Sequence, residues 1–219
     1  MLEPCFDGQI SILVVNARHM KNVPGRKTDM RDAQWIATLL RAGLLKGSFI
    51  PDKTFRELRH LTQYRKSIVR DITAQKNRID KFLQSSGFRF TAFLSDAFGA
   101  SGQNIIRHLM EYGNISREAL DRCLKTQTRK RIDEILIALN GSLSEHQRGF
   151  LRMIFGHLEA LEQHRHTVED AITKEITKHE EALSLLCSIP GIDVTAAAAI
   201  IAEIGTDMSA FPDSQHICS

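Results

Sequence analysis

The chain carries at residues 14–33 the sequence VVNARHMKNVPGRKTDMRDA, in which an apolar run leads into a basic loop and then a helix start. The loop contains Pro24 and Gly25, and two carboxylates follow it, Asp29 and Asp32. Residues three apart lie on one face of a helix, so both carboxylates can point at the same spot. Carboxylate oxygens suit a hard divalent cation. The spacing therefore predicts a pair of metal ligands.

The same residues also fit an ordinary helix start. Thr28 is a favourable N-cap, and aspartate in a first turn complements the helix dipole. Basic side chains on and before the helix could meet phosphate groups: Lys21, Arg26, Lys27 and Arg31. Because DxxD is a common pattern, spacing alone leaves the metal-binding and the capping interpretations open.

The apolar segment before the loop, residues 9–17, is rich in β-branched residues. This composition predicts a strand buried on both faces of a mixed or parallel sheet. Downstream we find no second convincing strand, because the remaining patterns are helical. A lone strand of this kind indicates a sheet whose other strands are absent.

The bulk composition narrows the class of protein. The 219 residues can form one large domain or two small ones, and the net charge of +3 restricts nucleic-acid contact to local patches. Four cysteines without a CxxC pair fit reduced thiols better than disulfides or zinc. No apolar run is long enough to span a membrane, and no signal peptide is recognisable. We therefore expect a cytoplasmic protein without membrane contact.

Two long segments carry apolar residues near a 3.5-residue period, which predicts amphipathic helices with coiled-coil character. The first spans 55–83; the second spans 145–187 and follows a capping-box pattern that starts at Ser144. Between them we expect a loop-rich bend at 84–103. Short helices forming a cap are predicted at 104–112, 116–124 and 129–139. The pattern indicates an antiparallel coiled-coil arm that could also pair with a second protomer.

Residues 186–205 read LCSIPGIDVTAAAAIIAEIG and resemble a helix-hairpin-helix. In such a turn Gly191 would expose N–H groups at the start of a helix near Thr195, where a backbone phosphate can bind. Asp193 is an unfavourable neighbour for phosphate. The alternative is a tight turn between two closely packed helices rich in small residues.

Residues 16–33, 39–45, 48–51 and 188–205 together closely resemble the DEDD-type insertion-sequence transposases of the IS110 family. The resemblance implies an RNase H-like domain whose Asp-Glu-Asp-Asp residues bind Mg²⁺ beside the scissile DNA. It also implies a serine nucleophile in a C-terminal domain and a guide RNA that selects the DNA target. Asp29 and Asp32 match the third and fourth acids of the motif.

The expected fold is mostly α. A remnant strand-loop-helix of the RNase H-like domain occupies 1–52, the coiled-coil arm with its cap occupies 53–187, and the start of a helix-hairpin-helix-like C-terminal domain occupies 188–219. The first two acids would precede Met1 and the serine would follow Ser219, so we expect a truncated, inactive copy of a transposase.

Two alternatives remain open. The chain could be a non-catalytic nucleic-acid-binding remnant that co-assembles with full-length transposase and interferes with it, or a helical scaffold without function. The expected partners are the DNA ends of the mobile element, a guide RNA and a second copy of the chain bound through the coiled coil. The expected location is the bacterial cytoplasm, at the nucleoid when DNA is bound.

Overall fold

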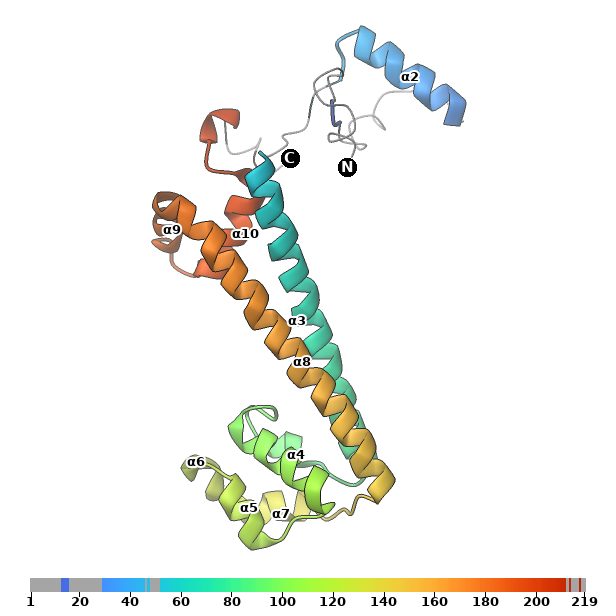
Figure 1. Cartoon of the computed structure of the whole chain (residues 1–219), viewed down its shortest axis with the longest axis vertical. Coiled ribbons are helices and arrows are strands. Elements are labelled where there is room, and N and C mark those ends of the chain that lie inside the picture. The colour runs from blue at the N-terminus through green and yellow to red at the C-terminus, as the bar shows by residue number, and fades with distance from the viewer. Residues whose placement is uncertain are drawn as a thin grey trace. The chain divides into compact units, whose positions relative to one another are not determined.

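A computed structural model describes residues 13–15, 29–45, 47, 52–211, 213 and 217, without the side chains of 29–32 and 210. These residues are mostly helical and include no strand (Figure 1), which confirms the mostly α prediction. In chain order the elements are α2 (Asp29–Arg41), α3 (Lys53–Ser85), η2 (Phe90–Phe93), α4 (Ala100–Tyr112), α5 (Arg117–Cys123), α6 (Thr126–Arg129), α7 (Ile132–Ala138), α8 (Glu145–Ile176), η3 (Thr177–His179), α9 (Glu180–Cys187), α10 (Val194–Ile204) and η4 (Met208–Ala210).

The chain divides into two compact units. One comprises Leu58–Leu183, and the other combines Met1–Glu57 with Ser184–Ser219. Within the described part of the chain, every helix is too short or too polar to cross a bilayer.

Helices α3 and α8 lie side by side and antiparallel (Figure 1). Near one end of the pair, Arg65 Nη2 lies 2.7 Å from Glu169 Oε1. Near the other end, the rings of Phe82 and Phe150 have centroids 5.1 Å apart. Residue numbers therefore rise along α3 as they fall along α8. The antiparallel pairing is confirmed, while its supercoiling as a coiled coil stays a prediction.

The pair is held by buried side chains that are three, four, seven or ten residues apart along the helices. On α3 they are Leu58, Ile68, Ile72, Ile79 and Leu83, and on α8 they are Leu151, Ile154, Leu158, Val168, Ile172 and Ile176. This spacing keeps one stripe of each helix against its partner. We call the two stripes together the seam.

The buried Gln75 interrupts the apolar seam. Its side chain is 1% exposed, and its Nε2 donates a hydrogen bond to the carbonyl oxygen of Ile154 at 2.6 Å. An unpaired buried amide would cost free energy, so this bond favours the one alignment of α3 and α8 that satisfies it.

Helix α8 begins where the capping-box pattern predicts. Ser144 Oγ accepts a hydrogen bond from the Gln147 N–H, and Gln147 Oε1 accepts one from the Ser144 N–H. The predicted continuous helix 145–187 is wrong at its far end, because α8 stops at Ile176 and a 3-10 turn precedes α9. There the Thr177 hydroxyl donates to the Thr173 carbonyl at 2.8 Å and competes with the backbone for this acceptor.

The cap between the two long helices consists of η2 and α4–α7 (Figure 1). The expected helix at 104–112 starts earlier, at Ala100, and Ser116 caps α5 through a hydrogen bond from the Ala119 N–H. The helix expected at 129–139 corresponds to α7, which begins later, at Ile132, because Lys130 and Arg131 form a turn that separates it from α6.

The predicted strand at residues 9–17 lies mostly outside the described residues. Its described part, 13–15, is not in a strand, and Leu13 and Val14 are nearly half exposed. A strand needs a neighbour for its backbone hydrogen bonds, and none exists among the described residues. The prediction is therefore wrong for these three residues.

Two helical glycines should respond in opposite directions to alanine. A Cβ at Gly102 would lie 1.8 Å from the carbonyl oxygen of Ala97, whereas a Cβ at Gly156 would have nothing within 4 Å. We expect Gly102→Ala to lower the free energy of unfolding by about 1–3 kcal/mol through overpacking. Gly156→Ala should raise it by about 0.5–1 kcal/mol, because alanine suits an exposed helix interior better.

Urea unfolding followed by circular dichroism measures both glycine variants. Equal effects of the two substitutions would contradict the close approach of Gly102 to Ala97.

Candidate functional site

Helix α2 begins at Asp29, one residue after the predicted cap Thr28, and Asp32 follows one helical turn later. Positions 29 and 32 therefore fall on the same side of the helix. The side chains of Asp29, Asp32 and Arg31 lie outside the described residues, as do Lys21, Arg26 and Lys27 in full. The helical backbone supports a shared face for the two acids.

The helix α2 ends just before Gly43. Gly43 has a φ of 67°, and its N–H donates to the Leu40 carbonyl at 3.0 Å. The Leu44 N–H donates to the Leu39 carbonyl, also at 3.0 Å. These two bonds form a Schellman motif, which satisfies carbonyls that a helix end would otherwise leave unpaired. The helix that carries the two acids thus has a defined length.

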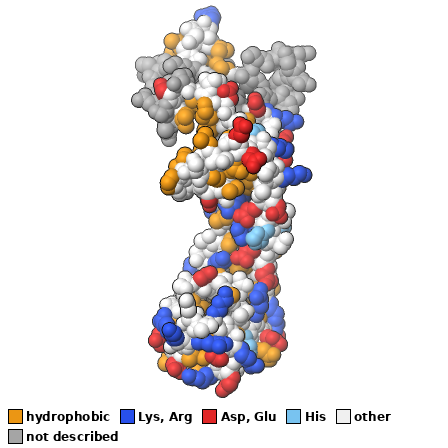
Figure 2. Space-filling model, turned by 90° about the vertical axis from the view of Figure 1, so that its left-hand side faces the viewer, with side chains coloured by type: hydrophobic (Ala, Val, Ile, Leu, Met, Phe, Trp, Pro, Cys, Tyr) orange, Lys and Arg blue, Asp and Glu red, His pale blue; other side chains and the backbone are white. Residues whose placement is uncertain are grey.

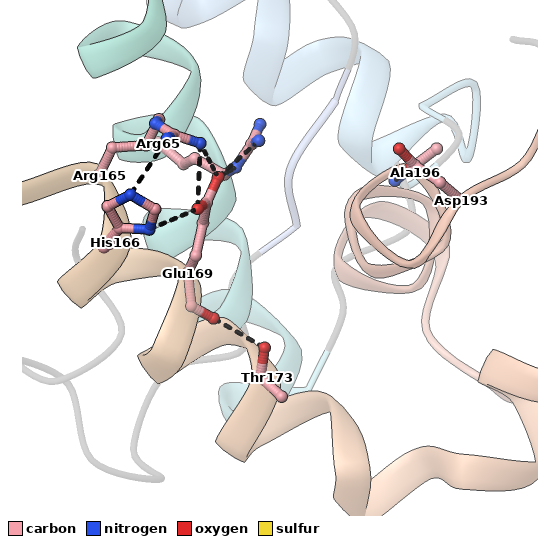
Figure 3. A network of polar contacts seen from close by, with 7 residues as sticks. All are labelled: Arg65, Arg165, His166, Glu169, Thr173, Asp193 and Ala196. Carbon is pink, nitrogen blue, oxygen red and sulfur yellow. Dashed lines mark hydrogen bonds and ion pairs between the residues drawn. The ribbon is translucent and has the colours of Figure 1, made fainter. Parts of the chain in front are cut away.

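The second candidate site is the turn between α9 and α10. The Ile192 N–H donates to the Ile189 carbonyl at 3.1 Å, and Gly191 has a φ of 91°, which a side chain would disfavour. Asp193 then caps α10, because its Oδ1 accepts a hydrogen bond from the Ala196 N–H at 2.7 Å (Figure 3).

The Asp193 cap affects both interpretations of this turn, the phosphate-binding site and the tight turn between packed helices. Its carboxylate occupies an N–H group that a phosphate would use, and it adds negative charge at the start of α10. Gly191 is exposed and Thr195 is half-buried, so both predicted contact residues remain near the surface. Along α10 a stripe of small and apolar residues is buried: Ala197, Ala198, Ile201 and Ala202.

Two family models match the chain. Residues 5–87 match the DEDD-type IS110 model described as Transposase, and residues 183–219 match the model described as Transposase IS116/IS110/IS902 family. Together the matches cover more than half of the 219 residues, in the order predicted from the sequence. The chain belongs to the IS110 family of transposases. A search of curated proteins gave no match.

The first IS110 match includes Asp29, Asp32 and the basic residues before them, and the second includes Gly191 and Thr195. A DEDD transposase uses a divalent metal, and two carboxylates one helical turn apart are suitable donors for such an ion. Among the described side chains, no group of three or more His, Cys, Asp or Glu lies close enough to hold a metal.

The structure also shows a charged cluster that the sequence analysis missed. Glu169 on α8 accepts hydrogen bonds from Arg65 Nε at 2.8 Å and from Arg165 Nη1 at 3.1 Å, and His166 Nδ1 lies 3.7 Å away (Figure 3). Arg65 and Arg165 both stand where the seam spacing would place an apolar residue. Because two arginines there would repel each other, Glu169 between them makes the arrangement favourable.

The side chains of Glu169, Arg65 and Arg165 are only about a quarter exposed and join α3 to α8, so we assign them a structural role. Elsewhere on the face shown in Figure 2, basic and acidic side chains are interspersed, without a continuous stripe of one sign. Nucleic-acid contact on that face would therefore depend on local groups.

Removing the charge of Glu169 should weaken the helix pair. In Glu169→Gln the two arginines lose their common carboxylate, and we expect the free energy of unfolding to fall by about 1–3 kcal/mol. The matched control is Glu159→Gln, whose pair with Arg107 is half exposed and should contribute less than about 1 kcal/mol.

The charge on Glu169 can be tested by urea unfolding of a third protein, Glu169→Gln with Arg165→Gln. Part of the lost stability should return in this protein, because one of the two positive charges is gone. No recovery would contradict the role assigned to Glu169.

Proposed function

We propose that Asp29 and Asp32 are two of the metal ligands of this IS110 transposase and act in cleavage and joining of the DNA ends of the mobile element. The family matches and the shared face of the two acids on α2 support this proposal. The metal we propose is Mg²⁺, a hard ion that prefers oxygen ligands and retains several waters.

The residues around this site have separate tasks. Asp29 and Asp32 would hold the ion, and Lys21, Arg26, Lys27 and Arg31 would bind the phosphates that flank the reacting bond. When bound, the ion stabilises negative charge on a phosphate oxygen. Two carboxylates from one turn leave most of the coordination to water and substrate. The expected inactivity of this chain stays a prediction.

A second DNA contact is proposed at the α9–α10 turn, where N–H groups near Gly191 and Thr195 would approach a backbone phosphate. The form of the turn and the exposure of Gly191 support the proposal, and the Asp193 charge opposes it. Self-association through α3 and α8 is a further proposal, based on the near-heptad apolar stripe of each helix. Binding of a guide RNA is a proposal that follows from the family resemblance.

Metal binding can be measured without any catalytic assay. Mn²⁺, which replaces Mg²⁺ in oxygen-ligand sites, loses its free-ion paramagnetic resonance signal when it binds. We expect the Asp29→Asn, Asp32→Asn double variant to bind Mn²⁺ at least tenfold more weakly than the unmodified chain, since each lost carboxylate removes a ligand.

The control for Mn²⁺ binding is Asp170→Asn, which removes an exposed carboxylate on α8 that pairs with no described residue. It should leave Mn²⁺ affinity unchanged. Equal affinities for the double variant and the unmodified chain would overturn the assignment of Asp29 and Asp32.

The α9–α10 turn can be tested by a substitution that keeps the cap and removes its charge. Asparagine caps a helix about as well as aspartate, so Asp193→Asn should change the free energy of unfolding by less than about 0.5 kcal/mol. If a phosphate binds at this helix start, affinity for duplex DNA at low salt should rise severalfold, because one repulsive charge is lost.

The matched control is Asp207→Asn, which also neutralises a capping carboxylate, bonded to the Ser209 N–H at 2.9 Å. Fluorescence anisotropy with labelled duplex DNA gives both affinities. A rise of the same size in both variants would indicate a general charge effect and would refute a phosphate site at Gly191.

A further inference from the structure

The cap contains an open cleft with a volume of about 640 Å³ between α4 and α5. These two helices pack against each other (Figure 1), and the cleft is far in sequence from the acids of α2. Its volume lies within the range of about 300–1,000 Å³ typical of small-molecule sites. The cleft can therefore hold a group of the size of a nucleotide.

Two aromatic rings line one side of the cleft. His108 and Tyr112 stand one turn apart on α4, with ring centroids 4.6 Å apart and planes inclined by 35°. Tyr112 is 59% exposed, so much of its ring is open to a ligand. Burial lowers the pKa of His108 below its ordinary value, so this ring is mostly uncharged at neutral pH. An exposed aromatic ring offers a stacking surface for a base.

A cation faces these rings from the other helix. Arg122, in the last turn of α5, is exposed and forms no hydrogen bond or ion pair with any described residue. Its charge acts on both rings of the cleft: it adds to the lowering of the His108 pKa that burial causes, and it partly offsets the rise of the Tyr112 pKa that Glu111 causes. Two other arginines of the cap, in contrast, are paired, Arg117 with Asp133 and Arg129 with Asp121.

The remaining lining is polar. Asn104, Asn114 and Ser116 offer amide and hydroxyl groups that can donate or accept hydrogen bonds. Glu111 is the one acid in the lining, and its hydrogen bond with the Tyr112 hydroxyl raises the pKa of that tyrosine. A carboxylate there repels phosphate but can accept hydrogen bonds from base amino groups.

We propose that this cleft binds an unstacked nucleotide of a single-stranded nucleic acid, with the base on Tyr112 and a phosphate on Arg122. An aromatic stacking surface beside a free cation is the combination used to bind single strands. This proposal rests on the proposed function in one respect: the choice of nucleic acid as the ligand, because a transposase binds nucleic acid. It adds a second contact on the cap, with its own residues.

The affinity test uses fluorescence anisotropy with a labelled single-stranded RNA and DNA of about 12 nucleotides. Tyr112→Ala should weaken binding of a strand by about 5- to 150-fold, the loss expected for one stacked base. Arg122→Gln should weaken it and reduce the slope of log affinity against log salt by about 0.7, the value for one phosphate of a single strand. A merely structural role for Arg122 would not change this slope.

Matched controls come from α3, where Tyr64 is 53% exposed and Arg70 is exposed without an ion pair to a described residue. Tyr64→Ala and Arg70→Gln should bind either strand like the unmodified chain. Circular dichroism establishes that all four variants fold. Equal losses in the cleft and control variants would overturn the proposal.

Cys123 lines the cleft and serves as an internal reporter. Its alkylation by iodoacetamide, read by peptide mass spectrometry, should slow at least fivefold when the strand binds, while alkylation of Cys187, outside the cleft, should not change. Unchanged labelling of Cys123 with bound strand would refute the site. Full competition by adenosine monophosphate at the affinity of the strand would show a free nucleotide as the ligand and would also refute it.

Failure of the cleft proposal can be separated from failure of the proposed function. If the Tyr112 and Arg122 variants bind strands normally while Asp29 and Asp32 still bind Mn²⁺, only the cleft proposal falls.

Discussion

The larger unit depends on the alignment of α3 with α8. An apolar seam alone would tolerate a shift of one helix by seven residues, because the apolar stripe of α3 would still pack against the apolar stripe of α8. Two polar interactions oppose such a slip: Gln75 needs the Ile154 carbonyl, and Arg65 needs Glu169. A slipped pair would leave the Gln75 amide unpaired and Arg65 without a carboxylate, while Arg165 would keep Glu169 because both residues lie on α8. Polar interruptions that weaken the seam locally therefore give it one register.

Periodicity and capping signals predicted most of this fold. The apolar spacing of α3 and α8 and the capping box at Ser144 are local features, and both appear where the sequence predicts them. The end of α8 at Ile176 was not predicted, because the apolar periodicity continues past this residue. The strand expected at 9–17 was inferred from composition, although a strand exists only with a partner.

Some candidate sites could likewise be predicted from local sequence patterns, and others could not. Asp29 and Asp32 could be proposed from the sequence, because a spacing of three residues places them on one helix face and the family resemblance suggests a role for that face. The Glu169 cluster could not, since it depends on which residue of α8 faces Arg65. The same holds for the cleft of Tyr112 and Arg122, which exists only once α4 packs on α5. Opposed arginines at seam positions were the one signal in the sequence that could have revealed the cluster.

Because α3 and α8 are far apart in the sequence, the order in which they are synthesised affects how the chain folds. Arg65 and Glu169 are 104 residues apart in the sequence, whereas Phe82 and Phe150 meet beside the cap and close a shorter loop. If α3 and α8 pair first at the cap end, each later contact closes only a small additional loop and costs little conformational entropy. On a ribosome, α3 is complete at Ser85 but α8 only at Ile176. At about 5–20 residues per second, the apolar stripe of α3 waits several seconds for its partner. A cap that folds early would hold the ends of α3 and α8 together and so speed their pairing.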